Sequence, residues 1–268
     1  MKRKPCVAGY FYPRSPDHLR STVERMVDRE SEKSRAVALV APHAGFEYSG
    51  KVAGAVFSSA HLPERFVIMG PNHRGGIKRF AIVAQGAWET PFGDVPIEES
   101  LAKLIKKNTT LVEEDEYSHS QEHSLEVQLP FIQYFIKAFS IVPLAIASLA
   151  TFLELEELGK AVANAIKDIG EEVLIISSTD MSHYVSQSEA REKDFMAIEK
   201  ILQLDAQGLY DVVKSESISM CGYQPTTAAL IAAKHLGAKK ADLIKYETSG
   251  DVTGNHSEVV GYAGIRIS

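Results

Sequence analysis

Short runs of apolar, mostly β-branched residues alternate along this chain with longer segments of helical periodicity, and this alternation constrains the fold more than any other feature. Strands that are nearly all Val, Ile and Leu are typical of sheets covered on both faces, and strands that alternate with helices supply such covers. We therefore expect an α/β fold, a single-domain three-layer α/β/α sandwich around one mainly parallel or mixed central sheet.

The expected strands cover residues 36–41, 65–69, 80–84, 140–145, 173–177, 241–246 and 258–267. The expected helices cover residues 50–59, 97–107, 125–138, 152–169, 189–202, 206–213 and 225–235. No long Gly/Ser/Pro linker interrupts this pattern, so we expect residues 1–268 to form one domain. Residues 248–257 are rich in turn formers and lie between two expected strands, which predicts a hairpin with a long mobile loop.

Charge and hydropathy exclude several classes of partner. The chain has 29 Lys and Arg against 35 Asp and Glu, a formal net charge of −6, and no basic cluster of the kind that binds a phosphate backbone. No apolar run approaches the roughly 18 residues of a membrane span, and the charged N-terminus has no apolar stretch after it. We therefore expect a cytoplasmic protein whose partner is a small molecule or peptide rather than nucleic acid or a membrane.

Three of the nine histidines follow expected strands within a few residues: His43, His73 and His183. If these strands are parallel, the three side chains lie at the carboxyl edge of the sheet, where open α/β folds bind their ligands. Imidazole is a common metal ligand and a general acid or base near neutral pH. The pattern predicts a metal site, an acid–base site or both, against the alternative that each histidine is simply a polar loop residue.

Cys221 precedes the helix expected from residue 225. A helix N-terminus favours the thiolate form of cysteine, so Cys221 is a candidate ligand or nucleophile; the alternative is that it packs as a small apolar residue. Cys6 has no such setting.

Residues 119–123 spell H-x-x-E-H, the order of an inverted zinc-peptidase motif. Pro130 disfavours one unbroken helix through residues 119–136, and the serines around the motif are typical of helix caps. The peptidase interpretation is therefore a minor alternative, and Glu122 and His123 remain candidates for the pocket wall.

Six motifs together resemble the Memo family, named after a mediator of ErbB2-driven cell motility. They are residues 8–13 (AGYFYP), 41–50 (APHAGFEYSG), 70–73 (GPNH), 122–130 (EHSLEVQLP), 177–183 (SSTDMSH) and 221–222 (CG). The match keeps the motif order from about residue 5 to residue 266. This family is similar in fold to the class III ring-opening dioxygenases of the LigB type, which use non-haem iron.

The resemblance implies a metal site with His43, His73 and Cys221 as ligands and with His183 and Asp180 as acid–base residues. It also makes Tyr48, Glu122 and His123 candidates for substrate contacts. In the dioxygenases a glutamate is the third ligand, whereas a thiolate would replace it here. A site with two histidines and a cysteine suits copper, zinc or iron, and we expect iron or copper rather than zinc. An oxidisable thiolate makes aromatic ring cleavage doubtful.

Three functions fit these residues. The first is a metal-dependent oxidoreductase. The second is a non-catalytic module that binds a small ligand or peptide in the same crevice, as the resemblance to animal members implies. The third is a hydrolase that uses zinc at residues 119–123 or the thiol of Cys221. We predict the first.

Overall fold

The computed structural model describes residues 2–75 and 78–268, and within these ranges nine strands form one mixed sheet. Four parallel strands form its centre, in the order β2 (Ala38–Ala41), β9 (Leu174–Ser178), β3 (Arg65–Pro71) and β8 (Ser140–Ile146). Beyond β8 lie β4 (Phe80–Ile82), antiparallel to β8, and then β7 (Val112–Glu114). Beyond β2 lies β12 (Val259–Ile267), antiparallel to β2, and β12 pairs antiparallel in turn with β11 (Ala241–Thr248) and β10 (His183–Val185).

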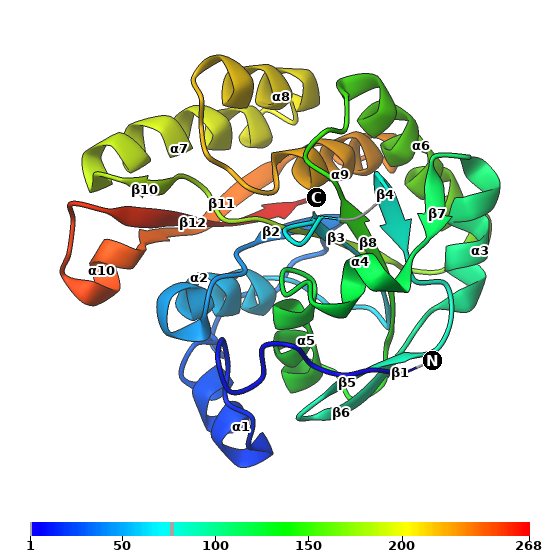
Figure 1. The fold of residues 1–268 in the computed structure, drawn as a ribbon, viewed down its shortest axis with the longest axis horizontal. Helices are drawn as coiled ribbons and strands as arrows, with labels where there is room; N and C mark the ends of the chain where they lie inside the picture. Colours follow the sequence, from blue (N-terminus) through cyan, green and yellow to red (C-terminus); the bar gives the residue numbers. More distant parts are fainter. Residues whose placement is uncertain (1, 76–77) are drawn as a thin grey trace.

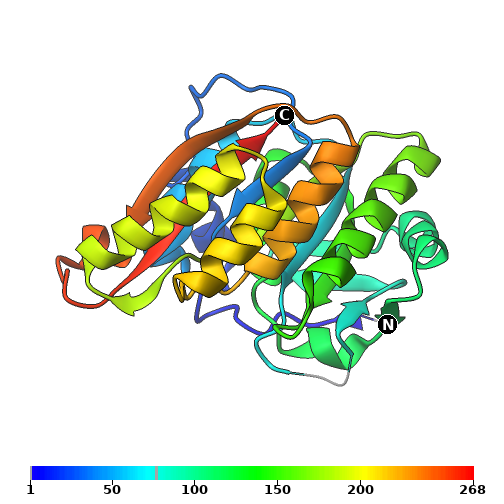
Figure 2. The ribbon, with the colours of Figure 1, turned by 90° about the horizontal axis from the view of Figure 1, so that it is seen from above.

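Helices cover both faces of this sheet (Figures 1 and 2). One layer contains α3 (Glu99–Asn108), α6 (Phe152–Ile169), α7 (Gln187–Leu202), α8 (Ala206–Ser215) and α9 (Tyr223–His235). The other contains α1 (Pro16–Glu24), α2 (Phe46–Ser58) and α5 (Leu129–Phe135), together with a small sheet of β1 (Lys2–Arg3), β5 (Ala87–Thr90) and β6 (Gly93–Pro96). In the described ranges, no helix combines the length and the apolar character that crossing a bilayer requires.

Each face of the sheet has its own apolar core, because successive strand residues point to opposite sides. In β2, Val40 packs with the core under α6 and α9, whereas its neighbour Leu39 packs with the core under α2 and α5. Both side chains are fully buried. This two-sided burial confirms the predicted α/β/α sandwich with a mixed sheet.

The structure corrects several local predictions. Residues 125–138, expected as one helix, contain the 3₁₀ turn η1 (Glu126–Gln128) followed by α5, with Pro130 in the first turn of α5, where a missing N–H costs little. The segment expected as a long hairpin loop contains a short helix, α10 (Ser249–Thr253), which begins with a capping box between Thr248 and Asp251. The hairpin itself is confirmed, since β11 and β12 pair antiparallel.

Candidate metal centre

The candidate site lies where three parallel strands end. His43 follows β2 by two residues, His73 follows β3 by two, and Asp180 follows β9 by two. Because β2, β9 and β3 are hydrogen-bonded in parallel, their carboxyl ends share one edge of the sheet. His43 and His73 therefore lie together at this edge, as the strand ends in the sequence predict.

Three imidazole rings meet at this edge. The candidate ligand nitrogens of His43, His73 and His123 all lie within 4.8 Å of one another. The rings of His73 and His123 are stacked with their centroids 4.7 Å apart, and the ring of His43 meets both edge-on at 5.1 and 5.4 Å. Three convergent imidazoles form a donor set that could hold a transition-metal ion.

The hydrogen bonds of His43 leave its inner nitrogen free. Ser178 donates its hydroxyl proton to the Ser124 carbonyl over 2.6 Å, so its oxygen must accept from the Nδ1–H of His43 at 2.9 Å. The same oxygen accepts from the amide of Gln128. His43 therefore carries its proton on Nδ1 and keeps a lone pair on Nε2, the form in which imidazole binds a metal.

Glu122 has the same effect on His73. Its carboxylate accepts from the backbone N–H of His73 at 2.6 Å and from the ring Nδ1–H at 3.0 Å. Burial alone would raise the pKa of Glu122, but the hydrogen bond and charge of His73, together with His123, outweigh burial and hold this pKa well below its usual range. Glu122 is thus an anion that accepts at Nδ1 of His73, so a metal ion would meet this ring at Nε2.

Burial also keeps two of the rings neutral at neutral pH. It lowers the pKa of His123 to about 4, with the charges of His73 and Arg74 acting in the same direction. The pKa of His43 is lowered well below its usual value, mainly by burial and then because a proton on His123 or His73 would repel a proton on His43. Neutral imidazole is the form that coordinates metal ions.

Cys221 lies beside His43, with its sulfur 3.3 Å from Nε2. The backbone N–H of Asp180 donates to the same sulfur at 3.3 Å, and Gly222 donates its N–H to Thr179 Oγ1 at 2.9 Å, which ties the start of α9 to the end of β9. Burial, followed by the charge of Asp180, raises the pKa of the Cys221 thiol. This corrects the expectation that the helix N-terminus favours a thiolate, so only a bound cation would deprotonate this sulfur.

Asp180 and His183 flank the cluster. The Asp180 carboxylate accepts from the backbone N–H of His43 at 2.8 Å, and burial raises its pKa. His183 donates its Nδ1–H to the carbonyl of Ser219 at 2.9 Å, which leaves Nε2 able to accept or deliver a proton. Tyr48 lies in the first turn of α2 with its ring exposed. The catalytic and substrate-contact roles of these residues stay predictions.

The sequence predicts His123 in the pocket wall, whereas its ring is one of the three that converge. The signal for His73 and His43 was a preceding strand, but His123 follows no strand: it lies between α4 (Glu116–Ser120) and η1. Glu122 is fully buried, and its oxygens bind His73 and the N–H of Ser124, which favours support of the cluster over a substrate contact.

The zinc-peptidase arrangement at residues 119–123 is not formed. The helix that would align its two histidines ends at Ser120. His119 donates Nε2–H to the Ala81 carbonyl at 3.1 Å and meets Trp88 edge-on, while His123 stacks on His73. The raised pKa of Cys221 likewise argues against a thiol hydrolase, because the neutral thiol is the poorer nucleophile.

Comparison with known proteins gives consistent similarities. The Memo-like protein family matches residues 3–266 of the chain. A MEMO1 family protein of Methanothermobacter thermautotrophicus is 41% identical over 275 residues, covering 98% of this chain and 99% of the relative. A MEMO1 family protein of Aquifex aeolicus is 41% identical over 268 residues, covering 98% of each. An uncharacterized protein of Escherichia coli K12, solved by crystallography, shares the fold with a TM-score of 0.55 at 14% identity, over 85% of this chain and 99% of that one.

Proposed function

Since the chain belongs to the Memo-like protein family, we propose that its histidine cluster binds one transition-metal ion, iron or copper, and that the protein is a metal-dependent oxidoreductase. The observation that carries this proposal is the convergence of His43, His73 and His123, whose ligand nitrogens lie within 4.8 Å of one another. The hydrogen bonds at Nδ1 turn Nε2 of His43 and His73 toward the cluster. Without a metal, Nε2 of His43 is within reach of the neutral Cys221 thiol, 3.3 Å away, and a bound ion would replace that proton.

The proposed ligands are His43, His73 and Cys221. Donor atoms around one four-coordinate ion lie about 3 to 4 Å apart, and the 3.3 Å separation of Cys221 Sγ from His43 Nε2 falls in this range. His123 is the competing third ligand and the one that the geometry favours, because its nitrogen lies within 4.8 Å of those of both His43 and His73, whereas Cys221 is outside that group and is placed only by its contact with His43. A thiolate with two imidazoles suits iron or copper, which exchange electrons, and such an ion would supply one-electron chemistry here.

The residues around the cluster are proposed to move protons and hold the substrate. His183 would exchange a proton at Nε2 while the Ser219 carbonyl fixes its ring, and Asp180 would orient the main chain of His43. Tyr48 and His123 would contact a small molecule or peptide bound over the cluster. A non-catalytic module that binds its ligand in the same crevice is the alternative that turnover would exclude.

Metal analysis of anaerobically purified protein tests this proposal. We expect about one ion per chain in the wild type, loss of the ion in His43→Ala and His73→Ala, and retention in the control His235→Ala, which changes an exposed residue at the end of α9. Cys221→Ser and His123→Ala decide the third ligand by which of them loses the ion. Reversible reduction and reoxidation of the bound ion would support redox function. A wild type that cannot be loaded with iron or copper would refute the proposal.

A further inference from the structure

Arg3, near the N-terminus, forms a buried ion pair with Glu126, which lies three residues after His123 of the cluster. The two side chains meet at 2.7 Å and are 10% and 0% exposed. Glu126 also accepts from the N–H groups of Cys6 and Val7 and from the hydroxyl of Tyr12. Arg3 and Glu126 therefore join the N-terminal segment to residues 119–126.

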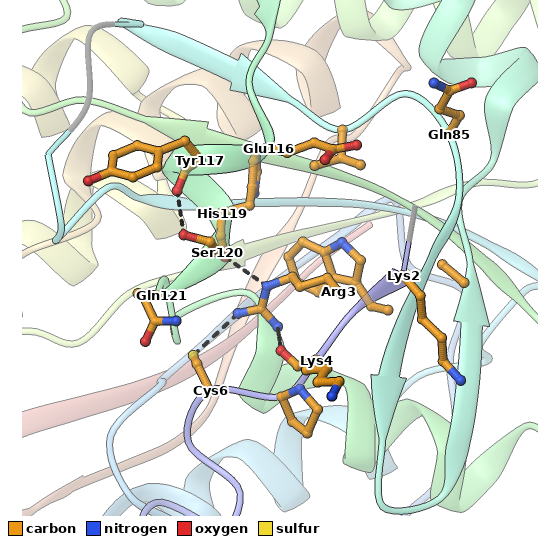
Figure 3. A pocket seen from close by; sticks show the side chains of 14 residues that line it. Lys2, Arg3, Lys4, Cys6, Gln85, Glu116, Tyr117, His119, Ser120 and Gln121 are labelled. Atoms are coloured by element: carbon orange, nitrogen blue, oxygen red, sulfur yellow. Dashed lines mark hydrogen bonds between the residues drawn. The ribbon is translucent and has the colours of Figure 1, made fainter.

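Arg3 lines a cavity of about 470 Å³, and Figure 3 shows its guanidinium bonded to Cys6 and Lys4 at the edge of that cavity. Nε donates to the His119 carbonyl at 2.7 Å, and one Nη donates to the Glu122 carbonyl at 2.7 Å and to the sulfur of Cys6 at 3.3 Å. The other Nη donates to the Glu126 carboxylate at 2.7 Å and to the Lys4 carbonyl at 3.5 Å. The guanidinium also lies 4.2 Å from the centre of the Trp88 ring. With all five N–H groups occupied, Arg3 is suited to holding main chain rather than a ligand.

The main chain that Arg3 holds supports all three rings of the cluster. Glu122 fixes the ring of His73, and His123 is itself one of the rings. The Ser124 carbonyl accepts from Ser178, whose oxygen fixes His43. A shift of residues 122–124 would therefore disturb every imidazole at once.

We infer that Arg3, anchored by Glu126, is a positioning residue for the metal centre. By holding the carbonyls of His119 and Glu122, it sets where residues 122–124 lie and so the orientation of the three histidines. This inference rests on the proposed metal-binding function. Residues that orient metal ligands change metal affinity by about 10- to 100-fold when they are replaced.

The test replaces Arg3 by lysine, which keeps the charge but cannot span the same acceptors, and follows Co²⁺ binding by visible absorption. Arg266→Lys is the matched control, because Arg266 is 14% exposed and also binds a carboxylate, Asp242, and a carbonyl, that of Ser59, away from the cluster. We expect Arg3→Lys to weaken Co²⁺ binding about 10- to 100-fold and to alter the absorption bands, and Arg266→Lys to change neither.

A second pair of variants guards against misfolding. Arg3→Gln with Glu126→Gln removes both buried charges together, so neither is left unpaired, and Arg266→Gln with Asp242→Asn is its control. Nitrogen NMR of the metal-free proteins adds a readout that needs no metal: the fixed Nδ1–H form of His73 should become a mixture only in the Arg3 variants. If Arg3 and Arg266 variants bind Co²⁺ equally and keep the same His73 signal, the inference is wrong. A wild type that binds no Co²⁺ would instead count against the proposed function, and the His73 signal would still decide the role of Arg3.

Discussion

Glu122 holds His73 at two points, because one carboxylate accepts both the backbone N–H and the ring Nδ1–H of that residue. The carboxylate is fully buried and anionic, and a third donor, the N–H of Ser124, completes its contacts. A carboxylate that accepts from the far nitrogen of an imidazole fixes its tautomer and makes the near nitrogen a better ligand. Glu122 is thus the residue that prepares His73 for a cation.

We predict that Glu122→Gln weakens metal binding about 10- to 100-fold. The amide has one oxygen instead of two, so it cannot accept at both points, and it removes the anion beside the imidazole. Competition for Zn²⁺ with a chromophoric chelator measures the change. Glu113→Gln is the control, since Glu113 lies in β7 and pairs with Lys78 at the surface. Equal affinities for the two variants would contradict this role of Glu122.

We predict that Ser178→Ala weakens metal binding by about tenfold. The change removes the oxygen that accepts from His43 Nδ1–H, so the ring is free to place its proton on Nε2 and lose its inner lone pair. Ser177→Ala is a close control: Ser177 is the preceding residue of β9, equally buried, and bonds Thr226 instead. Both changes should cost about 1 to 2 kcal/mol of unfolding free energy, measured in urea. A loss of affinity of the same size in both variants would exclude the tautomer explanation.

Much of the site could be predicted because strand ends can be recognised in the sequence. His43 and His73 each follow a run of buried strand residues, and parallel pairing brings them to one edge. His123 could not be found in this way, since its position depends on a loop that is held by Arg3 from more than 100 residues away. The protonation of Cys221 could not be predicted from the sequence either. Burial next to Asp180 raises the pKa of this thiol, whereas a helix N-terminus would lower it, and only the folded structure shows that burial.

In the fold, too, elements with clear local signals could be predicted, whereas elements that depend on tertiary contacts could not. The bounds of α6 were predicted to the residue, because a Thr151 capping box and a left-handed Gly170 mark its ends. The small sheet of β1, β5 and β6 is absent from the sequence prediction, since its strands have only two to four residues and β1 pairs with β5 from more than 80 residues away, although β5 and β6 form a local hairpin. Such short pairings are decided by tertiary contacts rather than by local pattern.

Helix packing gives a prediction for stability. Gly159 of α6 faces α9 so closely that a Cβ would lie 2.7 Å from the Ala228 carbonyl, which is main chain and cannot turn aside. We expect Gly159→Ala to lower the unfolding free energy by about 1 to 3 kcal/mol in urea denaturation. In Gly50→Ala of α2, the Cβ would meet only the flexible thioether of Met26, so the change should stay within about 1 kcal/mol of neutral. Similar losses for both would contradict the main-chain contact.

His119 supplies a prediction for acid stability. Its ring is fully buried, and this burial lowers its pKa to about 4, whereas an unfolded chain holds histidine near 6.5. Between these two pH values, His119 is protonated in the unfolded chain but stays neutral in the folded chain. The part of the unfolding free energy that depends on neutral His119 is therefore fully present above about pH 6.5, and it is lost as the pH falls toward about 4.

We predict that, in metal-free protein, His119→Gln removes the part of the decrease in unfolding free energy at acid pH that comes from protonation of His119. Glutamine can keep the donor to the Ala81 carbonyl but does not titrate. The drop in unfolding free energy from pH 7.5 to pH 4.5, measured in urea, should be smaller than in the wild type by about 2 to 3 kcal/mol. His43 and His123, whose pKa values are also lowered, keep their own share of the loss in the variant. His18→Gln, at an exposed position, should leave the wild-type drop unchanged; the same drop in His119→Gln would show that His119 is protonated in the folded chain.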